Sequence, residues 1–216
     1  MKNIVIAGAS SGLGLKLSKL LINNHLFLLA RNIKKTDIAG KNVRKISCDL
    51  QSLSDIKKAV SLVDKPINVF INCAGIELGK SLEKSSDQEI VNLINTNLLG
   101  AIFISKYIYQ KMLKNNQGYI INVASTSGKK ARSNETVYCA SKFGLAGFTE
   151  SLRLEAKEHN IKVSTIYPGG MKTNFWKNSS KDISNYMNPK HVAKMIINLI
   201  NSDSKICPSE LVIERI

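Results

Sequence analysis

The sequence lacks several features that would assign it to a specialised class of protein. Its four cysteines, Cys48, Cys73, Cys139 and Cys207, form no CxxC pair, and its three histidines are scattered, so no metal site is predicted. The longest uncharged stretches are too short to span a membrane, and the apolar run near the N-terminus is too short for a signal peptide. We therefore expect a cytoplasmic protein with reduced thiols and no membrane contact.

Acidic residues are also scarce: 16 Asp and Glu stand against 31 Lys and Arg, which gives a net charge of +15. Such an excess of positive charge is typical of nucleic-acid-binding proteins. However, the lysines are spread along the whole chain instead of being gathered in one block, and only five of the basic residues are arginine. We expect no nucleic-acid partner, and the charge is explained either by attraction for anionic ligands or by compositional bias.

Apolar strand-like runs alternate with helical patterns along the chain. Strands are predicted over residues 3–8, 25–30, 42–50, 67–75, 118–125, 162–170 and 210–216. Helices are predicted over 13–24, 52–63, 86–113 and about 136–159, and a last one is predicted from 188 onward. Such alternation produces right-handed βαβ units, and the chain contains no Pro/Gly-rich linker. The sequence therefore predicts one α/β domain over 1–216, with a Rossmann-like doubly wound parallel sheet of about seven strands and helices on both faces.

Three of these helices have recognisable start signals. Ser52 is a predicted N-cap, and Ser86 with Glu89 forms a capping-box pattern. Asn188 precedes Pro189, which suits the first position of a helix. In this last helix, one apolar face is predicted from Val192, Met195, Ile196 and Leu199.

Ligands of doubly wound sheets bind at the carboxyl ends of the strands. The first strand ends in GASSGLG (8–14), a G-x-x-x-G-x-G turn that precedes a helix. Its backbone amides and the helix N-terminus suit a phosphate. The candidate dinucleotide contacts in this turn are Gly8, Ser10, Ser11, Gly12, Leu13 and Gly14.

The second strand ends in LARN (29–32), where an NAD-selective site would carry a carboxylate for the ribose 2′-hydroxyl. Ala30 stands there instead, and Arg31 follows it. A guanidinium can bind a 2′-phosphate through two hydrogen bonds. The sequence therefore predicts NADP(H) in preference to NAD(H), with Arg31 as the selective residue; Lys34 and Lys35 are either additional contacts or ordinary solvated lysines.

The other strand ends supply further candidate cofactor contacts. Asp49 is placed to accept a hydrogen bond from the adenine amino group, or else to cap the next helix. The small residues after the fourth strand let a cofactor approach the backbone, and the turn after the sixth strand faces its nicotinamide end. The remaining candidates are Leu50, Asn72, Ala74, Gly75, Pro168, Gly169, Met171 and Thr173.

Tyr138 and Lys142 are four positions apart, so in a helix they share a face. A lysine cation favours the phenolate, which predicts a tyrosine whose pKa is lowered toward neutral pH and which acts as a general acid or base. Ser125, at the end of the fifth strand, adds a hydroxyl to the same cleft. An exposed Tyr-Lys pair without function is the alternative explanation of the spacing alone.

Six motifs in order and register resemble the short-chain dehydrogenase/reductase family over nearly the whole chain. They are GASSGLG, NCAG (72–75), NTNLLG (95–100), INVASTSG (121–128), YCASK (138–142) and YPGGMKT (167–173). The resemblance implies a seven-stranded Rossmann-like sheet and a catalytic set of Ser125, Tyr138, Lys142 and Asn97, with Ser125 and Tyr138 also contacting the substrate. It further implies that Tyr138 and Lys142 contact the cofactor, and that the protein forms a homodimer or homotetramer through helices 86–113 and 136–159.

Two departures from the family pattern affect the interpretation. Many NADP-preferring members carry a basic residue where this chain has Ser11, so the NADP(H) prediction depends on Arg31. The region after the sixth strand is short, which leaves a small predicted substrate lid over 171–188. The aromatic and apolar residues of this lid either line the substrate pocket or simply pack the loop; they are Met171, Phe175, Trp176 and Tyr186.

The sequence predicts an NADP(H)-dependent oxidoreductase that transfers a hydride between nicotinamide and a carbonyl or secondary alcohol. A reductase of a 3-oxoacyl thioester, a sugar or a small ketone is favoured. Lys129, Lys130 and Arg132, between Ser125 and Tyr138, weakly favour an anionic substrate. The alternative is a catalytically silent NADP(H)-binding redox sensor, although such a protein has no need of the complete catalytic set.

Overall fold

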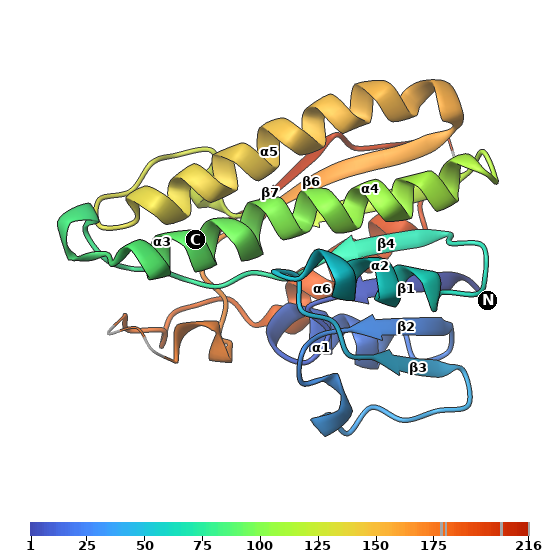
Figure 1. Ribbon diagram of the computed structural model, residues 1–216, viewed down its shortest axis with the longest axis horizontal. Coiled ribbons are helices and arrows are strands. Elements are labelled where there is room, and N and C mark those ends of the chain that lie inside the picture. The colour runs from blue at the N-terminus through green and yellow to red at the C-terminus, as the bar shows by residue number, and fades with distance from the viewer. Residues whose placement is uncertain (178, 180, 204, 216) are drawn as a thin grey trace.

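Parallel strands form one central sheet in the computed structural model, which describes residues 1–177, 179, 181–203 and 205–215. Within these residues the sheet has seven strands in the order β3-β2-β1-β4-β5-β6-β7 (Figure 1). Their bounds are β1 Asn3–Ala7, β2 His25–Leu29, β3 Val43–Ile46, β4 Val69–Asn72, β5 Gly118–Val123, β6 Ile161–Pro168 and β7 Glu210–Ile213. The predicted α/β fold with a doubly wound parallel sheet is confirmed, although the strands are shorter than predicted. Residue 216 of the predicted last strand lies outside the described residues.

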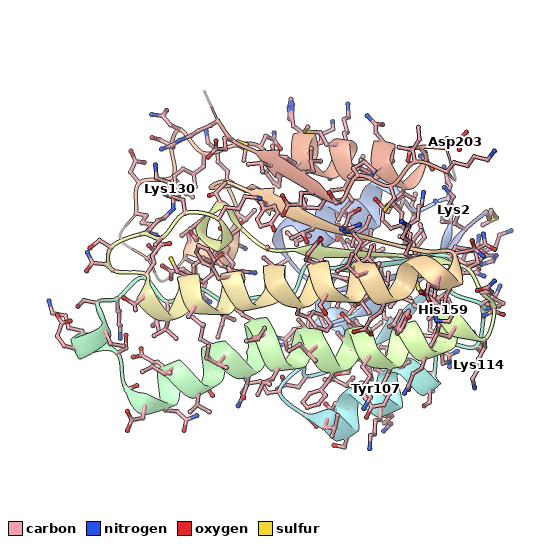
Figure 2. All side chains as sticks on the ribbon, turned by 90° about the horizontal axis from the view of Figure 1, so that it is seen from above. Lys2, Tyr107, Lys114, Lys130, His159 and Asp203 are labelled. Atoms are coloured by element: carbon pink, nitrogen blue, oxygen red, sulfur yellow. The ribbon has the colours of Figure 1, made fainter. Side chains whose placement is uncertain are left out.

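Helices cover both faces of this sheet. One face is packed by α1 (Gly12–Leu20) and α6 (Pro189–Ile200), and the other by α2 (Leu53–Ser61), α4 (Gly100–Leu113) and α5 (Thr136–Ala156). Alternate residues of β1 point to opposite faces: Ile4 and Ile6 pack with the first pair of helices, and Val5 with the second group. The strands are therefore apolar throughout, as expected for a parallel sheet buried on both sides. Figure 2 shows α4 and α5 lying side by side on the second face.

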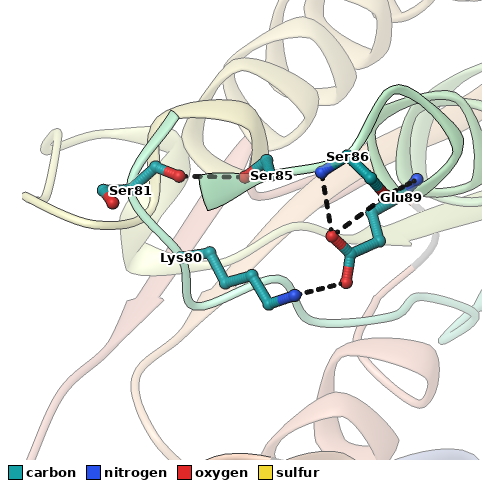
Figure 3. A network of polar contacts seen from close by, with 5 residues as sticks. All are labelled: Lys80, Ser81, Ser85, Ser86 and Glu89. Atoms are coloured by element: carbon teal, nitrogen blue, oxygen red, sulfur yellow. Dashed lines mark hydrogen bonds and ion pairs between the residues drawn. The ribbon is translucent and has the colours of Figure 1, made fainter. Parts of the chain in front are cut away.

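The predicted start signals of the helices are confirmed. The Ser52 side chain caps α2, and the Asn188 side chain caps α6, which has proline at its first position. At the start of α3 (Asp87–Ile94) the capping box is complete: Ser86 Oγ accepts from the Glu89 amide, and Glu89 Oε2 accepts from the Ser86 amide at 3.0 Å. Lys80 Nζ also lies 2.6 Å from Glu89 Oε1, so one glutamate holds both the helix start and the preceding loop (Figure 3).

The predicted helix over 86–113 is not a single regular α-helix. It consists of α3, a π-helical turn at Asn95–Leu99, and then α4. In a π-helical turn each backbone hydrogen bond spans one more residue than in the α-helix, so the face presented to the sheet changes at this point. The turn contains Asn97, which is fully buried. Its side chain accepts a hydrogen bond from the Ile76 amide, so it lies near the carboxyl end of β4.

The predicted apolar face of α6 was wrong in one residue. Val192 and Ile196 are buried as predicted, but Met195 is 41% exposed. Ala193 and Ile200 complete the buried face instead. The error arises because a helix of this length presents only a narrow stripe to the sheet, and residues just beside that stripe remain in solvent.

Lysines occupy distant parts of the surface. Lys2 and Lys114 lie at one end of the molecule, whereas Lys130 lies at the other (Figure 2). Within the described part of the chain, no helix has the length and apolar character needed to cross a bilayer. The same residues contain no group of three or more His, Cys, Asp or Glu side chains arranged to hold a metal ion.

Candidate active site

A cavity of about 910 Å³ lies along the carboxyl ends of the strands. This volume is within the range of sites that bind cofactors and small molecules. The cavity extends from the turn after β1, past the end of β2, to the start of α5 and the segment after β6. Most of the candidate residues from the sequence line it: Gly8, Ser10, Ser11, Gly12, Leu13, Arg31, Asp49, Leu50, Ala74, Gly75, Ser125, Tyr138, Lys142, Pro168, Gly169, Met171 and Thr173.

The turn after β1 depends on two glycines in the left-handed region. Gly8 has φ 76° and Gly12 has φ 51°, values that residues with a Cβ rarely adopt. A Cβ on Gly8 would also lie 2.7 Å from the Ala74 amide nitrogen, and one on Gly12 would lie 3.5 Å from Thr173 Cβ. Gly8 thus lets this turn approach the backbone after β4, and Gly12 faces Thr173 in the turn after β6. Because the Ser11 side chain makes no capping bond, the first amides of α1 remain free for an anionic group.

Gly14 does not line the cavity, although it was predicted as a cofactor contact. A Cβ at this position would lie 2.3 Å from the carbonyl oxygen of Gly8, so Gly14 allows α1 to pack against the turn. Asn72 is likewise outside the cavity lining: it is fully buried, and its Oδ1 accepts from the Ala74 amide at 3.2 Å. We assign both residues to the support of the cavity wall.

We expect Gly14→Ala to destabilise the protein by roughly 1–3 kcal/mol, because the new methyl group must displace backbone atoms. Gly147→Ala is a matched control, since a Cβ there meets nothing within 4 Å. In the interior of helix α5 this control gains up to about 1 kcal/mol of helix propensity. Urea unfolding of the two variants should therefore shift in opposite directions, and equal shifts would contradict the close packing at Gly14.

The end of β2 presents positive charge to the cavity. Arg31 and Lys35 line it, whereas Lys34 does not. The nearby Asp37 is engaged with Lys19 at 2.7 Å across an exposed ion pair. At the end of β3, Asp49 lines the cavity while its Oδ1 accepts from the Gln51 amide at 3.0 Å. Asp49 therefore faces the cavity and shapes the turn before α2, whereas the alternative that it caps this helix is wrong, because the Ser52 side chain is the cap.

Ser125, Tyr138 and Lys142 come together at the other end of the cavity. Tyr138 is 6% exposed and lies in the first turn of α5, and Lys142, one turn later, is 3% exposed. Lys142 Nζ lies 5.8 Å from the centre of the Tyr138 ring and donates to the Val123 carbonyl at 3.3 Å. Ser125 Oγ accepts from the Ser127 amide at 3.1 Å. The burial of the tyrosine and the lysine in one cavity excludes the exposed Tyr-Lys pair considered from the spacing alone.

The prediction that Lys142 lowers the pKa of Tyr138 is not supported by the structure. Burial raises the pKa of Tyr138 above its ordinary value, and the hydrogen bond with Ser125 opposes this only in part. Burial also lowers the pKa of Lys142, to about 8. Desolvation thus outweighs the attraction between the lysine and a phenolate. The structure holds Tyr138 as a neutral phenol, which is the form that donates a proton.

The burial of Lys142 has a consequence for stability. Because its pKa falls from 10.5 to about 8, the folded protein binds fewer protons than the unfolded chain between these two pH values. Stability linked to this group therefore rises with pH across that interval, and at neutral pH the buried ammonium is destabilising. We expect Lys142→Met to raise the urea midpoint at pH 7, with a smaller gain at about pH 9.5, where the wild-type lysine is already neutral. The exposed Lys34→Met is the control, and an equal gain at both pH values would contradict this interpretation.

Asn97 does not line the cavity, but it holds the wall next to Lys142. Its Oδ1 accepts from the Ile76 amide at 2.8 Å, and its Nδ2 donates to the Ile76 carbonyl at 2.9 Å. A Cβ on Gly75 would lie 3.3 Å from Asn97 Oδ1 and 3.5 Å from Lys142 Nζ. The asparagine and the lysine thus flank the same glycine, and Asn97 fixes the backbone that follows β4.

The segment after β6 closes the cavity on the side of Tyr138. All four aromatic and apolar residues singled out in the predicted lid line the cavity, namely Met171, Phe175, Trp176 and Tyr186. Residues 178 and 180 of the predicted lid lie outside the described residues. Among the three basic residues before Tyr138, only Arg132 lines the cavity; Lys129 pairs with Glu210 at 2.6 Å instead.

Several residues of the site were not predicted from the sequence. Glu77, Ser127, Glu135 and Lys181 all line the cavity. Glu135 stands three residues before Tyr138, at a helix start, where an acidic side chain is common and does not indicate a site. Its contact with Lys181 joins positions 46 residues apart, so no local pattern predicts it. Its position near the candidate tyrosine was the one available signal.

The fold and this cavity define a Rossmann-like α/β protein with a Ser-Tyr-Lys site. A family model described as short chain dehydrogenase matches residues 2–184. The chain therefore belongs to the short-chain dehydrogenase family, whose members are oxidoreductases acting on C=O and CH–OH groups, and the resemblance found from its motifs is confirmed.

Individual relatives agree with this assignment. Carbonyl reductase family member 4 of Danio rerio is 30% identical over 92% of this chain and 90% of its own length. The 3-oxoacyl-[acyl-carrier-protein] reductase of Bos taurus is 29% identical over 84% of this chain and 81% of its own length. Among solved structures, a variant of actinorhodin polyketide ketoreductase with NADPH is 26% identical, with a TM-score of 0.85 over 99% of this chain and 95% of its own.

Proposed function

We propose that this protein is an NADP(H)-dependent reductase that transfers a hydride from the nicotinamide to the carbonyl carbon of a small-molecule substrate. One observation carries the proposal. Tyr138 and Lys142 are buried beside Ser125 at one end of a cavity whose other end is lined by Arg31. The first end suits proton donation to a carbonyl oxygen, and the second suits a phosphorylated ribose.

The cavity residues fit NADP(H). Gly8 and Gly12 give the turn after β1 the backbone conformation that points the start of α1 at the cavity, and the free amides there suit a pyrophosphate. Arg31 and Lys35 provide positive charge for a 2′-phosphate. The ketoreductase of similar structure was solved with NADPH, which supports the same choice here.

Each residue of the catalytic set has a distinct proposed role. When bound, the reduced nicotinamide supplies the hydride. Tyr138 donates the phenolic proton to the substrate oxygen, and the Ser125 hydroxyl stabilises the negative charge that develops there. Lys142 holds the nicotinamide ribose, and its position beside Tyr138 favours return of a proton to the phenolate. Asn97 keeps the adjoining wall in place and is proposed to hold a water that relays protons to Lys142.

We propose a 3-oxoacyl thioester as the first substrate class to test, because a relative matched over most of the chain is named as a 3-oxoacyl-[acyl-carrier-protein] reductase. Sugars and small ketones are the other proposed classes. Segment 171–188 is the proposed substrate lid of a single catalytic domain over 1–216. We also propose a homodimer or homotetramer, since apolar side chains are exposed on α3, α5 and the turn before α4, namely Val91, Leu99, Phe143 and Leu154. A cytoplasmic location is proposed as well.

The test is NADPH consumption by the purified protein with a panel of 3-oxoacyl thioesters, ketosugars and simple diketones, run beside NADH. We expect turnover with at least one class and a preference for NADPH. Tight NADPH binding without turnover across a broad panel would favour the alternative of a redox sensor. Turnover with NADH alone would contradict the proposed cofactor.

A further inference from the structure

The lid segment, residues 171–188, is a loop closed at its base. The Lys172 amide donates to the Met187 carbonyl at 2.8 Å, and the Met187 amide donates to the Gly170 carbonyl at 3.0 Å. Met171 and Met187 form a bridge between the two arms. The base of the loop is therefore fixed by backbone hydrogen bonds, and side-chain contacts decide how the rest lies over the cavity.

These side-chain contacts lead to the catalytic tyrosine. Phe175 meets Tyr138 edge to face, with ring centres 6.2 Å apart, and Trp176 meets Phe175 at 5.0 Å. Lys181 Nζ lies over the Trp176 ring, 4.8 Å from its centre. The same ammonium forms an ion pair with Glu135 Oε1. Lys181 thus links the aromatic part of the lid to the start of α5.

Glu135 uses both carboxylate oxygens to connect different parts of the chain, and the residue is only 8% exposed. Its Oε1 accepts a hydrogen bond from Lys181 Nζ, and its Oε2 accepts one from Ser127 Oγ at 3.0 Å. The Ser127 amide in turn donates to Ser125 Oγ. The carboxylate therefore bridges the lid, the loop that carries Ser125, and the helix turn that carries Tyr138.

We propose that Glu135 is a positioning residue of the reductase: through Lys181 it holds the lid over the substrate, and through Ser127 it fixes Ser125 against Tyr138. This inference rests on the proposed function for its kinetic consequences, but not for its structural ones. The ion pair between Glu135 and Lys181, here called the lid bond, governs how tightly substrate is held. The Ser127 bond governs how well the hydroxyl of Ser125 is placed for the chemical step.

The two bonds can be separated by substitution. Lys181→Met removes the ion pair with Glu135 together with the contact of the ammonium over Trp176, and it leaves the Glu135–Ser127 hydrogen bond in place. Glu135→Gln removes the ion pair but keeps an amide within reach of Ser127. Glu135→Leu removes both bonds. Lys172→Met is the matched control, since Lys172 is an exposed lysine of the same segment and does not line the cavity.

We expect Lys181→Met and Glu135→Gln to raise the KM of the carbonyl substrate by about tenfold, the ratio that about 1.4 kcal/mol of lost interaction produces. Glu135→Leu should raise KM similarly and also lower kcat, because Ser125 loses its support. The single variants Glu135→Lys and Lys181→Glu should each raise KM. The double variant that combines them restores an ion pair and should bring KM back toward the wild-type value. A KM equal to that of the wild type in all variants, or a loss that the double variant does not relieve, would overturn the proposal.

A measurement without substrate makes the test independent of turnover. Chymotrypsin cleaves after Phe175 and Trp176, and cleavage at these two bonds is followed by mass spectrometry, because Lys181→Met adds a weaker chymotrypsin site at position 181. We expect faster cleavage in the lid of Lys181→Met and Glu135→Gln, an unchanged rate in Lys172→Met, and slower cleavage again in the double variant. If the wild type reduces no carbonyl, the proposed function fails while this comparison still decides the lid contact. Equal cleavage rates in all variants would overturn the inference.

Discussion

Replacing Tyr138 by phenylalanine is expected to lower kcat by about 10²–10⁴, the range typical of a lost general acid. The phenol is buried, and burial keeps it protonated, so no exposed water replaces it as proton donor. The phenyl ring still fills the same space, so the fold and the binding of NADPH should be retained. Steady-state reduction and NADPH fluorescence titration measure the two quantities separately.

Tyr109→Phe is the matched control for this prediction, because Tyr109 lies on α4 against His159, away from the cavity. Its kcat should equal that of the wild type. If Tyr138→Phe retains full activity, the phenol is not the proton donor. If it loses NADPH binding as well as activity, the effect is structural and the assigned role is not supported.

Replacing Arg31 by alanine is expected to reduce the preference for NADPH over NADH by about 10- to 100-fold. This range corresponds to the roughly 1.5–3 kcal/mol of a hydrogen bond to a charged group. The loss should appear mainly as a higher KM for NADPH, since the 2′-phosphate is remote from the reacting carbon. The KM for NADH should change little, because NADH carries no such phosphate.

Lys34→Ala is the control that separates a specific contact from the general charge of the protein. It removes the same unit charge from the same stretch, but Lys34 does not line the cavity. If the control weakens NADPH binding as much as Arg31→Ala does, long-range attraction explains the preference. If neither variant changes the ratio of NADPH to NADH use, the prediction of NADP(H) selectivity from the end of β2 is wrong.

The sequence was sufficient to predict the fold and most of the cavity lining. Parallel strands buried on both faces are apolar throughout, and the residues that follow them must meet at one edge of the sheet. This is why Gly8, Arg31 and Ser125, which are far apart in the chain, were predicted together. Helix starts were also predictable, because Ser86 and Glu89 satisfy each other's backbone amides through local contacts.

Other features depend on packing that local patterns do not reveal. The π-helical turn around Asn97 interrupts a pattern that is apolar enough for one continuous helix. The pKa of Tyr138 follows from burial against the segment after β4, helix α3 and Phe175 of the lid, so the spacing to Lys142 gave the wrong direction. The pairing of Glu135 with Lys181 joins two segments whose relative position is set only by the complete sheet.

The most direct test of the central claim is to follow the transferred hydride. The protein is incubated with NADPH deuterated at the transferable C4 position and a 3-oxoacyl thioester, and the product alcohol is analysed by mass spectrometry. We predict one deuterium on the new carbinol carbon with the wild type, and a strongly reduced yield of the same labelled product with Tyr138→Phe. An unlabelled alcohol, or equal yields from the two proteins, would contradict hydride transfer with Tyr138 as the proton donor.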